Sequence, residues 1–201
     1  MIEAPMPNQK STSKPLAGGS VPQRFRNQQA TLFDFLDEAL VVCPNCANCA
    51  TVTRAGSADS GSFVPHRLIC AHCGLARTEQ NAGLNRSWSG APEDGFFHLP
   101  LWLQAPCCGH VLWAHNARHL RFLKAYVGAE LRERRHDPEH GWLNKSLASR
   151  LPKWMQLAKH RESILRAIGK LEHRLVDAES EKSEFSRAPR SQKSKRAPRK
   201  P

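Results

Sequence analysis

The chain has 201 residues, of which 40% are hydrophobic, and a formal net charge of +12 at pH 7. This length allows one domain of ordinary size, or a small domain with appended segments. No apolar run reaches the roughly 18 residues needed to span a bilayer, and residues 1–20 lack the apolar segment of a signal peptide. We therefore expect a soluble, cytoplasmic protein without a membrane partner, in which closely spaced cysteines indicate metal binding rather than disulfides.

The N-terminal segment, residues 1–30, is rich in Pro, Ser, Gln and Asn and is expected to be disordered because it lacks the apolar content of a core. Residues 31–40 follow with a candidate N-cap, Thr31, and early acidic residues, which predicts a short helix. This helix would lead directly into the first of two cysteine pairs.

The two pairs are Cys43-Pro-Asn-Cys46 and Cys70-Ala-His-Cys73, separated by 23 residues, 47–69. Zinc prefers four tetrahedral thiolate or imidazole ligands, and a C-x-x-C turn presents two sulfurs to one ion. The pattern predicts one structural Zn²⁺ bound by all four cysteines in a ribbon-like domain at residues 31–79. Disulfides or inert buried thiols would not explain the doubled motif.

A third cysteine, Cys49, leaves the first ligand pair open. Cys46 and Cys49 have the same spacing as Cys43 and Cys46, and Ala47 stands where a glycine is usual after the second cysteine of such a turn. We favour Cys43 and Cys46, because proline after the first cysteine suits that turn. An iron–sulfur cluster is disfavoured because the run lacks the fourth cysteine and proline of the bacterial pattern.

Two β-hairpins are predicted around the cysteines. Residues 51–54 and 63–69 alternate well enough to pair, and within an extension at residues 80–117, residues 96–103 and 111–114 form a second hairpin that turns at residues 106–109. Cys107 and Cys108 beside His110 could supply a second metal site or replace a ligand of the first, form a nucleophile or redox pair, or be plain turn and core residues. We favour the last role, and we expect the five tryptophans to be core or interface residues rather than base-stacking platforms.

Helical periodicity begins after Asn116 and defines a basic helical subdomain at residues 118–178. In the first helix an apolar stripe runs from Leu120 to Leu131, beside a basic side that reaches Arg135. Ser146 caps a short helix, Pro152 opens the next, and a final helix has a stripe from Ile164 to Leu175. Residues 136–141 contain two histidines and two acidic residues, but Pro138 and Gly141 predict a connecting loop rather than a metal site.

The positive charge is concentrated in the second half of the chain. Lys and Arg minus Asp and Glu is −2 for residues 31–79 (3 − 5), +7 for 118–178 (14 − 7) and +5 for 179–201 (8 − 3). Phosphate neutralisation by such residues is blind to base sequence and sensitive to salt. The candidate nucleic-acid contacts are the helix residues Arg118, Arg121, Lys124, Arg132 and Arg135 and the tail residues Arg190, Lys193, Lys195 and Arg196.

The cysteine pairs, residues 101–116 and residues 144–155 together resemble bacterial proteins described as transcription-factor-IIB-type zinc-ribbon-containing. The resemblance covers roughly residues 42–175; it implies a zinc-ribbon fold and names no activity. The extra Cys49 and the absence of a glycine at Ala47 depart from the usual knuckle.

The fold class we expect is α+β: an N-terminal zinc ribbon and a second β-hairpin packed with a small C-terminal helical subdomain, followed by a disordered basic tail at residues 179–201. The predicted function is a zinc-stabilised binding module that contacts nucleic acid through its basic helices and tail. A protein-interaction adaptor that docks through the ribbon or the tryptophan-bearing hairpin is the alternative. An enzyme is disfavoured, because the sequence has no phosphate-binding loop, dinucleotide fingerprint, zinc-protease motif or nucleophile elbow.

Overall fold

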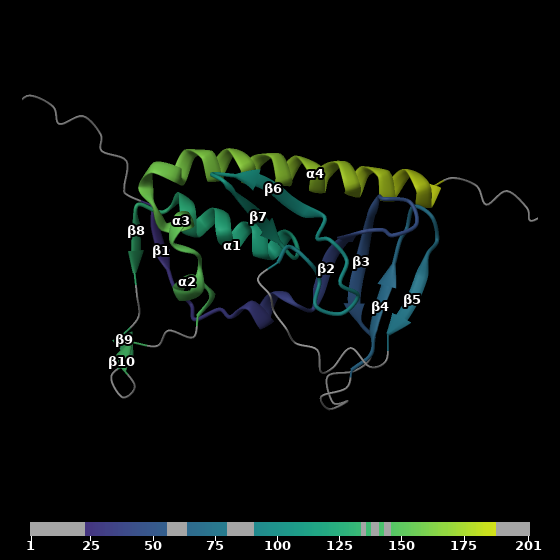
Figure 1. The fold of residues 1–201 in the computed structure, drawn as a ribbon, viewed down its shortest axis with the longest axis horizontal. Helices are drawn as coiled ribbons and strands as arrows, with labels where there is room; N and C mark the ends of the chain where they lie inside the picture. The colour runs from purple at the N-terminus through teal and green to yellow at the C-terminus, as the bar shows by residue number, and fades with distance from the viewer. Residues whose placement is uncertain are drawn as a thin grey trace, which may run out of the picture.

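The computed structural model describes residues 23–55, 64–79, 91–133, 136–137, 141–142 and 146–187. A β-rich N-terminal region carries the four paired cysteines, and a long C-terminal helix runs the length of the molecule above it (Figure 1). The predicted α+β class is therefore confirmed.

The N-terminal region is a four-stranded antiparallel sheet in the order β2 (Glu38–Val42), β3 (Cys49–Arg54), β4 (His66–Ile69) and β5 (Ala76–Glu79). The hairpin predicted at residues 51–69 is confirmed as β3 and β4, with Val52 opposite Leu68. The helix predicted at residues 31–40 is wrong: only a 3-10 turn, η1 (Leu32–Phe35), forms before the chain enters β2. Pairing of β2 with β3 replaces the expected helical bonds.

The second hairpin consists of β6 (Leu103–Cys107) and β7 (His110–Ala114). Cys108 and Gly109 form its turn with φ of 54° and 76°, the positive values that a tight hairpin turn with the twist of its strands requires. The prediction of a strand over residues 96–103 is wrong up to residue 102. There Asp94 holds a turn instead, its carboxylate accepting hydrogen bonds from the amides of Phe96, Phe97 and Leu99.

The longest helices of the described residues are α1 (Ala117–Gly128) and α4 (Arg161–Arg187). Leu120, Leu123 and Val127 are buried as the apolar stripe of α1 predicts, but the helix stops at Gly128. Residue 131 begins β8 (Leu131–Glu133), so the predicted extension of the helix to Arg135 is wrong. α4 packs on α1 and β6 (Figure 1).

Part of the N-terminal segment predicted to be disordered is ordered. β1 (Arg24–Arg26) pairs in parallel with β8. Phe25 anchors this strand to α1: the centroid of its ring lies 5.4 Å from that of Phe122 and 5.3 Å from that of Tyr126, both in edge-on contacts. At the other end, α4 continues to Arg187, past the predicted start of the tail at residue 179. The first helix-breaking residue after α4 is Pro189.

Short elements connect α1 to α4: β9 (His136–Asp137) pairs with β10 (Gly141–Trp142), where we had expected a loop. α2 (Leu147–Arg150), α3 (Lys153–Gln156) and η2 (Ala158–His160) follow. Ser146 caps α2 as predicted by accepting a hydrogen bond from the Ser149 amide, and Pro152 caps α3 rather than lying in its first turn.

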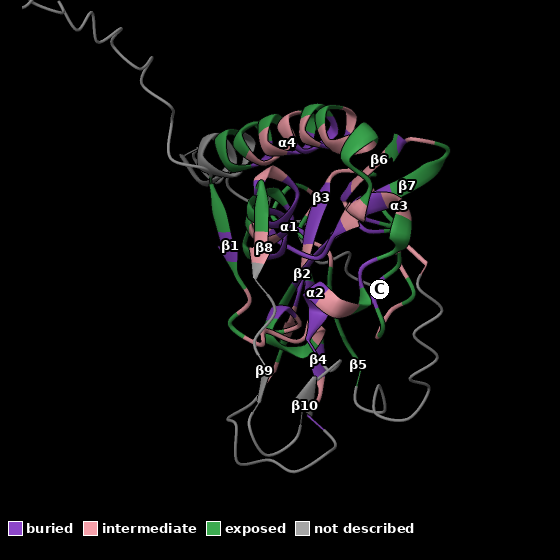
Figure 2. Ribbon diagram, turned by 90° about the vertical axis from the view of Figure 1, so that its left-hand side faces the viewer, coloured by how far each residue is buried: buried purple, intermediate pink, exposed green. Residues whose placement is uncertain are grey.

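The interior has two apolar clusters. The ribbon cluster lies on one face of the sheet and includes Val41, Val52, Leu68 and Leu101. The main cluster lies between α1, α4 and the β6–β7 hairpin (Figure 2). Among the described residues, no helix is both long and apolar enough to cross a membrane.

Candidate metal centre

The two cysteine pairs lie in turns with the same backbone geometry. In the first, the Cys43 amide donates to the Asn48 carbonyl at 2.8 Å and the Ala47 amide donates to the Cys43 carbonyl at 2.9 Å. In the second, the Cys70 amide donates to the Leu75 carbonyl at 2.9 Å and the Gly74 amide to the Cys70 carbonyl at 3.0 Å. Each turn thus closes around its own pair of sulfurs, as in a zinc knuckle.

The structure brings Cys43, Cys46, Cys70 and Cys73 together, with their sulfurs all within 4.8 Å of one another. The Sγ atoms of Cys43 and Cys73 are 3.7 Å apart, and those of Cys46 and Cys70 are 3.6 Å apart. A disulfide would require about 2.05 Å. Four sulfurs at about 2.3 Å from a tetrahedral Zn²⁺ lie about 3.8 Å from one another, so the four cysteines could hold a metal ion of this size.

The pKa values of the thiols differ because their surroundings differ. Hydrogen bonds from the Asn45 side chain and the Leu75 amide lower the pKa of Cys73 to about 6, whereas burial raises the pKa of Cys70 to about 12. The Asn45 amide also donates to the sulfur of Cys43 at 3.4 Å. Donors directed at sulfur favour thiolates, and a bound cation offsets both the burial of Cys70 and the repulsion among four sulfurs.

Cys49 is not part of this group. It is the first residue of β3, and successive side chains in a strand point to opposite faces of the sheet. Its side chain belongs to the main cluster, while its neighbour Ala50 belongs to the ribbon cluster. Its carbonyl lies 3.9 Å from the sulfur of Cys70.

Cys107 and Cys108 lie at the tip of the β6–β7 hairpin. Cys107 is buried, which raises its pKa to about 11, and its sulfur is 3.6 Å from that of Cys108. In the described part of the chain, the only group of three or more Cys, His, Asp or Glu side chains arranged to hold a metal is the four-cysteine site.

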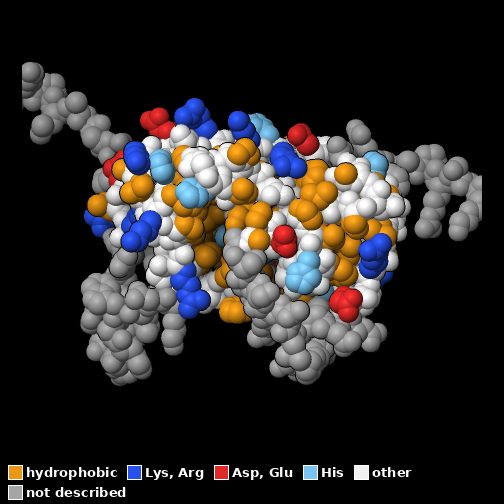
Figure 3. Space-filling model, in the orientation of Figure 1, with side chains coloured by type: hydrophobic (Ala, Val, Ile, Leu, Met, Phe, Trp, Pro, Cys, Tyr) orange, Lys and Arg blue, Asp and Glu red, His pale blue; other side chains and the backbone are white. Residues whose placement is uncertain are grey.

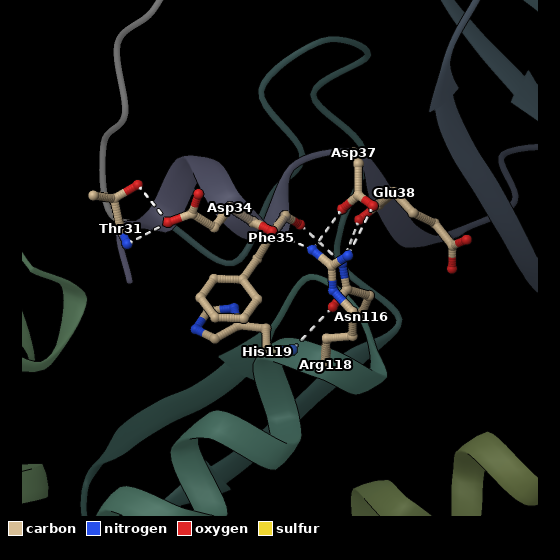
Figure 4. A network of polar contacts seen from close by, with 8 residues as sticks. All are labelled: Thr31, Asp34, Phe35, Asp37, Glu38, Asn116, Arg118 and His119. Atoms are coloured by element: carbon tan, nitrogen blue, oxygen red, sulfur yellow. Dashed lines mark hydrogen bonds and ion pairs between the residues drawn. The ribbon is translucent and has the colours of Figure 1, made fainter. Parts of the chain in front are cut away.

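Two of the basic residues of α1 predicted to contact nucleic acid form ion pairs with acidic side chains of the same chain. Arg118 makes an ion pair with Asp37 at 3.1 Å and also donates to the Asp34 carbonyl (Figure 4). Lys124 makes an ion pair with Glu172 at 2.8 Å, which joins α1 to α4. Exposed pairs of this kind contribute little stability, but they reduce the net positive charge of the helix surface.

The remaining predicted contacts fall into three groups. Arg132 lies in β8, donates to the Tyr126 and Gln156 carbonyls at 3.0 Å, and stacks over the Tyr126 ring. Arg121 is exposed and donates to the Ala117 carbonyl. Arg135 and the tail positions Arg190, Lys193, Lys195 and Arg196 lie outside the described residues. On the face drawn in Figure 3, Lys and Arg side chains are scattered among apolar ones.

The structure contains a cavity of about 750 Å³ that the sequence did not predict. η1, β7, α1, α2 and α3 each contribute to its lining, with residues as far apart in sequence as Thr31 and Met155. Within its own element, each lining residue has the sequence pattern of an ordinary core or surface position. No local sequence pattern therefore indicates the cavity.

The comparisons with known proteins add no relative to this description. No family model matches the chain, and searches of curated proteins and of solved structures found no match.

Proposed function

We propose that Cys43, Cys46, Cys70 and Cys73 bind one structural Zn²⁺ ion, and that the chain is a non-catalytic, zinc-stabilised binding module of the cytoplasm. The observation that carries this proposal is the pair of equivalent turns whose sulfurs lie 3.6–3.7 Å apart across the site. Four thiolates complete a tetrahedral shell and leave no open position for water or substrate. The resemblance to transcription-factor-IIB-type zinc ribbons supports the same assignment.

Metal content of purified protein tests the zinc assignment. Replacing Cys70 with Ser removes one ligand from the buried side of the site, so bound zinc should fall from about one equivalent per chain to a small fraction of that. Cys49→Ala is the matched control, because this buried cysteine contributes no sulfur to the site; it should retain the metal. Elemental analysis that finds no zinc in the wild type, or full zinc in Cys70→Ser, contradicts the assignment.

For the partner of this module, we propose nucleic acid, contacted mainly by the C-terminal tail and not by α1. Residues 188–201 contain six Lys and Arg and no Asp or Glu. In contrast, Arg118 and Lys124 already face carboxylates, and Arg132 is bonded to carbonyls. The remaining free positive charge on the helix is therefore small, and phosphate contacts are better supplied by the tail.

Truncation after Arg187 tests the nucleic-acid proposal, because it removes the basic tail and leaves α4 intact. Binding to duplex and single-stranded probes should weaken for all sequences alike, and the slope of log affinity against log salt should fall by roughly 0.7 to 0.9 for each phosphate that the tail no longer neutralises. Arg121→Gln is the control within the helix and should change affinity little.

Two results would contradict this proposal. The first is no binding by the full chain at about 50 mM salt, where electrostatic association is strong; it would favour the protein-interaction adaptor. The second is an unchanged salt slope after truncation, which would return the contacts to the helices.

A further inference from the structure

The walls of the 750 Å³ cavity are built from segments that the fold holds in place. One wall is formed by Thr31, Leu32 and Phe33 in and beside η1. Asn116 fixes the end of η1 to the first turn of α1, because its side-chain amide donates to the Phe35 and Glu38 carbonyls at 2.8 Å (Figure 4). The opposite wall is α3, where the Trp154 ring stacks on His110 of β7 at 4.9 Å. The cavity is thus bounded by elements tied to one another.

The interior of the cavity is apolar. Its buried lining comprises Leu112, Leu123, Leu147, Leu151 and Met155, and the half-buried rings of Trp113 and Trp154 extend toward the surface. Exposed Phe33 and Val111 stand at the rim. In Figure 3, apolar side chains gather around a hollow left of the centre. A volume of this size, with such a lining, is typical of small-molecule sites, which usually measure about 300–1,000 Å³.

The polar groups of the cavity define one charged end. Among the described residues that line it there is no Asp or Glu, and Arg150, an exposed residue, is the only one of them with a permanent charge. Within the described residues, Arg150 makes no ion pair with an acidic side chain. His119 also lines the cavity, but burial and the neighbouring His115 lower its pKa to about 3, so its ring stays neutral at physiological pH.

We propose that this cavity binds a small apolar carboxylic acid, whose hydrocarbon or aromatic body lies against the leucines and tryptophans and whose carboxylate pairs with Arg150. The guanidinium presents a planar fork of donors that matches a carboxylate. An apolar cation is disfavoured because the described lining offers it no acidic partner. A strongly polar ligand would leave its hydrogen bonds unsatisfied against the leucine side chains. This site is independent of the metal centre.

The proposal can be tested with decanoate as the probe on full-length, zinc-loaded protein. The indole N–H signals of the tryptophans are followed by NMR during titration, with assignments from single Trp→Phe variants. Trp113 and Trp154 line the cavity, whereas Trp102 lies elsewhere, under Arg174 at 4.4 Å. We expect saturable shifts of the Trp113 and Trp154 signals with one midpoint, and no shift of the Trp102 signal.

Two variants separate recognition of the carboxylate from simple partitioning into an apolar space. Arg150→Gln should weaken decanoate binding by about tenfold, while binding of the uncharged 1-decanol should be the same in wild type and variant. Arg166→Gln, which removes an exposed arginine of α4 outside the cavity, should bind decanoate like the wild type. Both substitutions are at exposed positions, so the fold should survive, and far-UV circular dichroism checks this.

Each other result overturns the proposal. Absence of a saturable shift, or equal movement of the Trp102 signal, rules out the cavity as the site. Unchanged decanoate affinity in Arg150→Gln, or decylamine binding as tight as decanoate, rules out the carboxylate and its arginine partner.

Discussion

Ala47 has a left-handed backbone conformation, with φ of 59°, at the position where the second knuckle has Gly74 with φ of 73°. Both amides donate to the carbonyl of the first cysteine of their turn, so the geometry is required by the knuckle and not by the side chain. For alanine this conformation costs roughly 1–2 kcal/mol relative to a right-handed one. Alanine in place of glycine at position 47 therefore adds local backbone strain but leaves the geometry of the first cysteine turn equivalent to that of the second.

Ala47→Gly should stabilise the metal-loaded protein by about 0.5–1 kcal/mol, because relief of the left-handed strain exceeds the extra freedom of glycine in the unfolded chain. Gly74→Ala should destabilise it by a similar amount. A Cβ at Gly74 would meet no atom within 4 Å, so the effect there is confined to the backbone. Urea unfolding at saturating zinc measures both, and a less stable Ala47→Gly variant would contradict the account.

The helices and strands that were predicted correctly are those whose local sequence preferences agree with their tertiary contacts. The β3–β4 hairpin, the β6–β7 turn and the start of α1 at Asn116 belong to this group. Thr31 and Asp34 do form a reciprocal cap, with the Thr31 amide 2.6 Å from the carboxylate, yet the helix they indicate ends at Phe35. Strand pairing of β2 with β3 overrides the local preference, and a single sequence does not reveal that pairing.

The candidate sites differ in the same way. The four-cysteine cluster was predicted because two short motifs define it locally, and Cys49 was the main ambiguity in its ligand set. The choice between Cys43 and Cys49 as the partner of Cys46 depends on where β3 begins, since the strand directs the Cys49 side chain to the other face of the sheet. The cavity was not predicted, because its lining comes from five separate elements.

Asn116 joins three elements, and its removal should be costly. Its Oδ1 accepts from the His119 amide at 2.9 Å, while its Nδ2 donates to carbonyls of η1 and β2. Asn116→Ala should lower the free energy of unfolding by about 2–4 kcal/mol, from a lost cap of about 1 kcal/mol and carbonyls left without donors.

Asn116→Asp isolates the donated bonds, because a carboxylate still caps α1 but has no N–H groups for the Phe35 and Glu38 carbonyls. Chemical denaturation should find this variant at least as unstable as Asn116→Ala. Stability equal to that of the wild type would show that only the cap matters.

For the whole molecule, the two apolar clusters imply that the two halves would depend to different degrees on a metal bound by the four cysteines for their stability. The ribbon cluster is small and includes two of the four cysteines, Cys43 and Cys70, whereas the main cluster is larger and contains none of them. The two halves are joined by backbone hydrogen bonds, such as that from the Leu40 amide to the His115 carbonyl at 2.7 Å. Loss of a bound metal should therefore disturb the β2–β5 sheet before the helices.

Removal of zinc by a chelator should accelerate amide hydrogen exchange in β3, β4 and β5 by at least about tenfold. Amides of α1 and the first turns of α4 should be nearly unchanged. Hydrogen exchange read by mass spectrometry compares loaded and stripped protein, and zinc added back provides the control for reversibility. Equal loss of protection in α1 would mean that the metal supports a single cooperative unit.

The hairpin of β3 and β4 has one end beside the four cysteines and an opposite end, where the Ala55 amide donates to the Pro65 carbonyl at 2.7 Å. Residues 56–63 connect the strands at that opposite end. Closing a longer connection costs only about 0.6 kcal/mol for each doubling of its length, and an ion bound by the four cysteines would join the turns at the other end. This connection is therefore a position at which the β2–β5 sheet should tolerate an inserted epitope or a second domain while the four-cysteine site keeps its geometry.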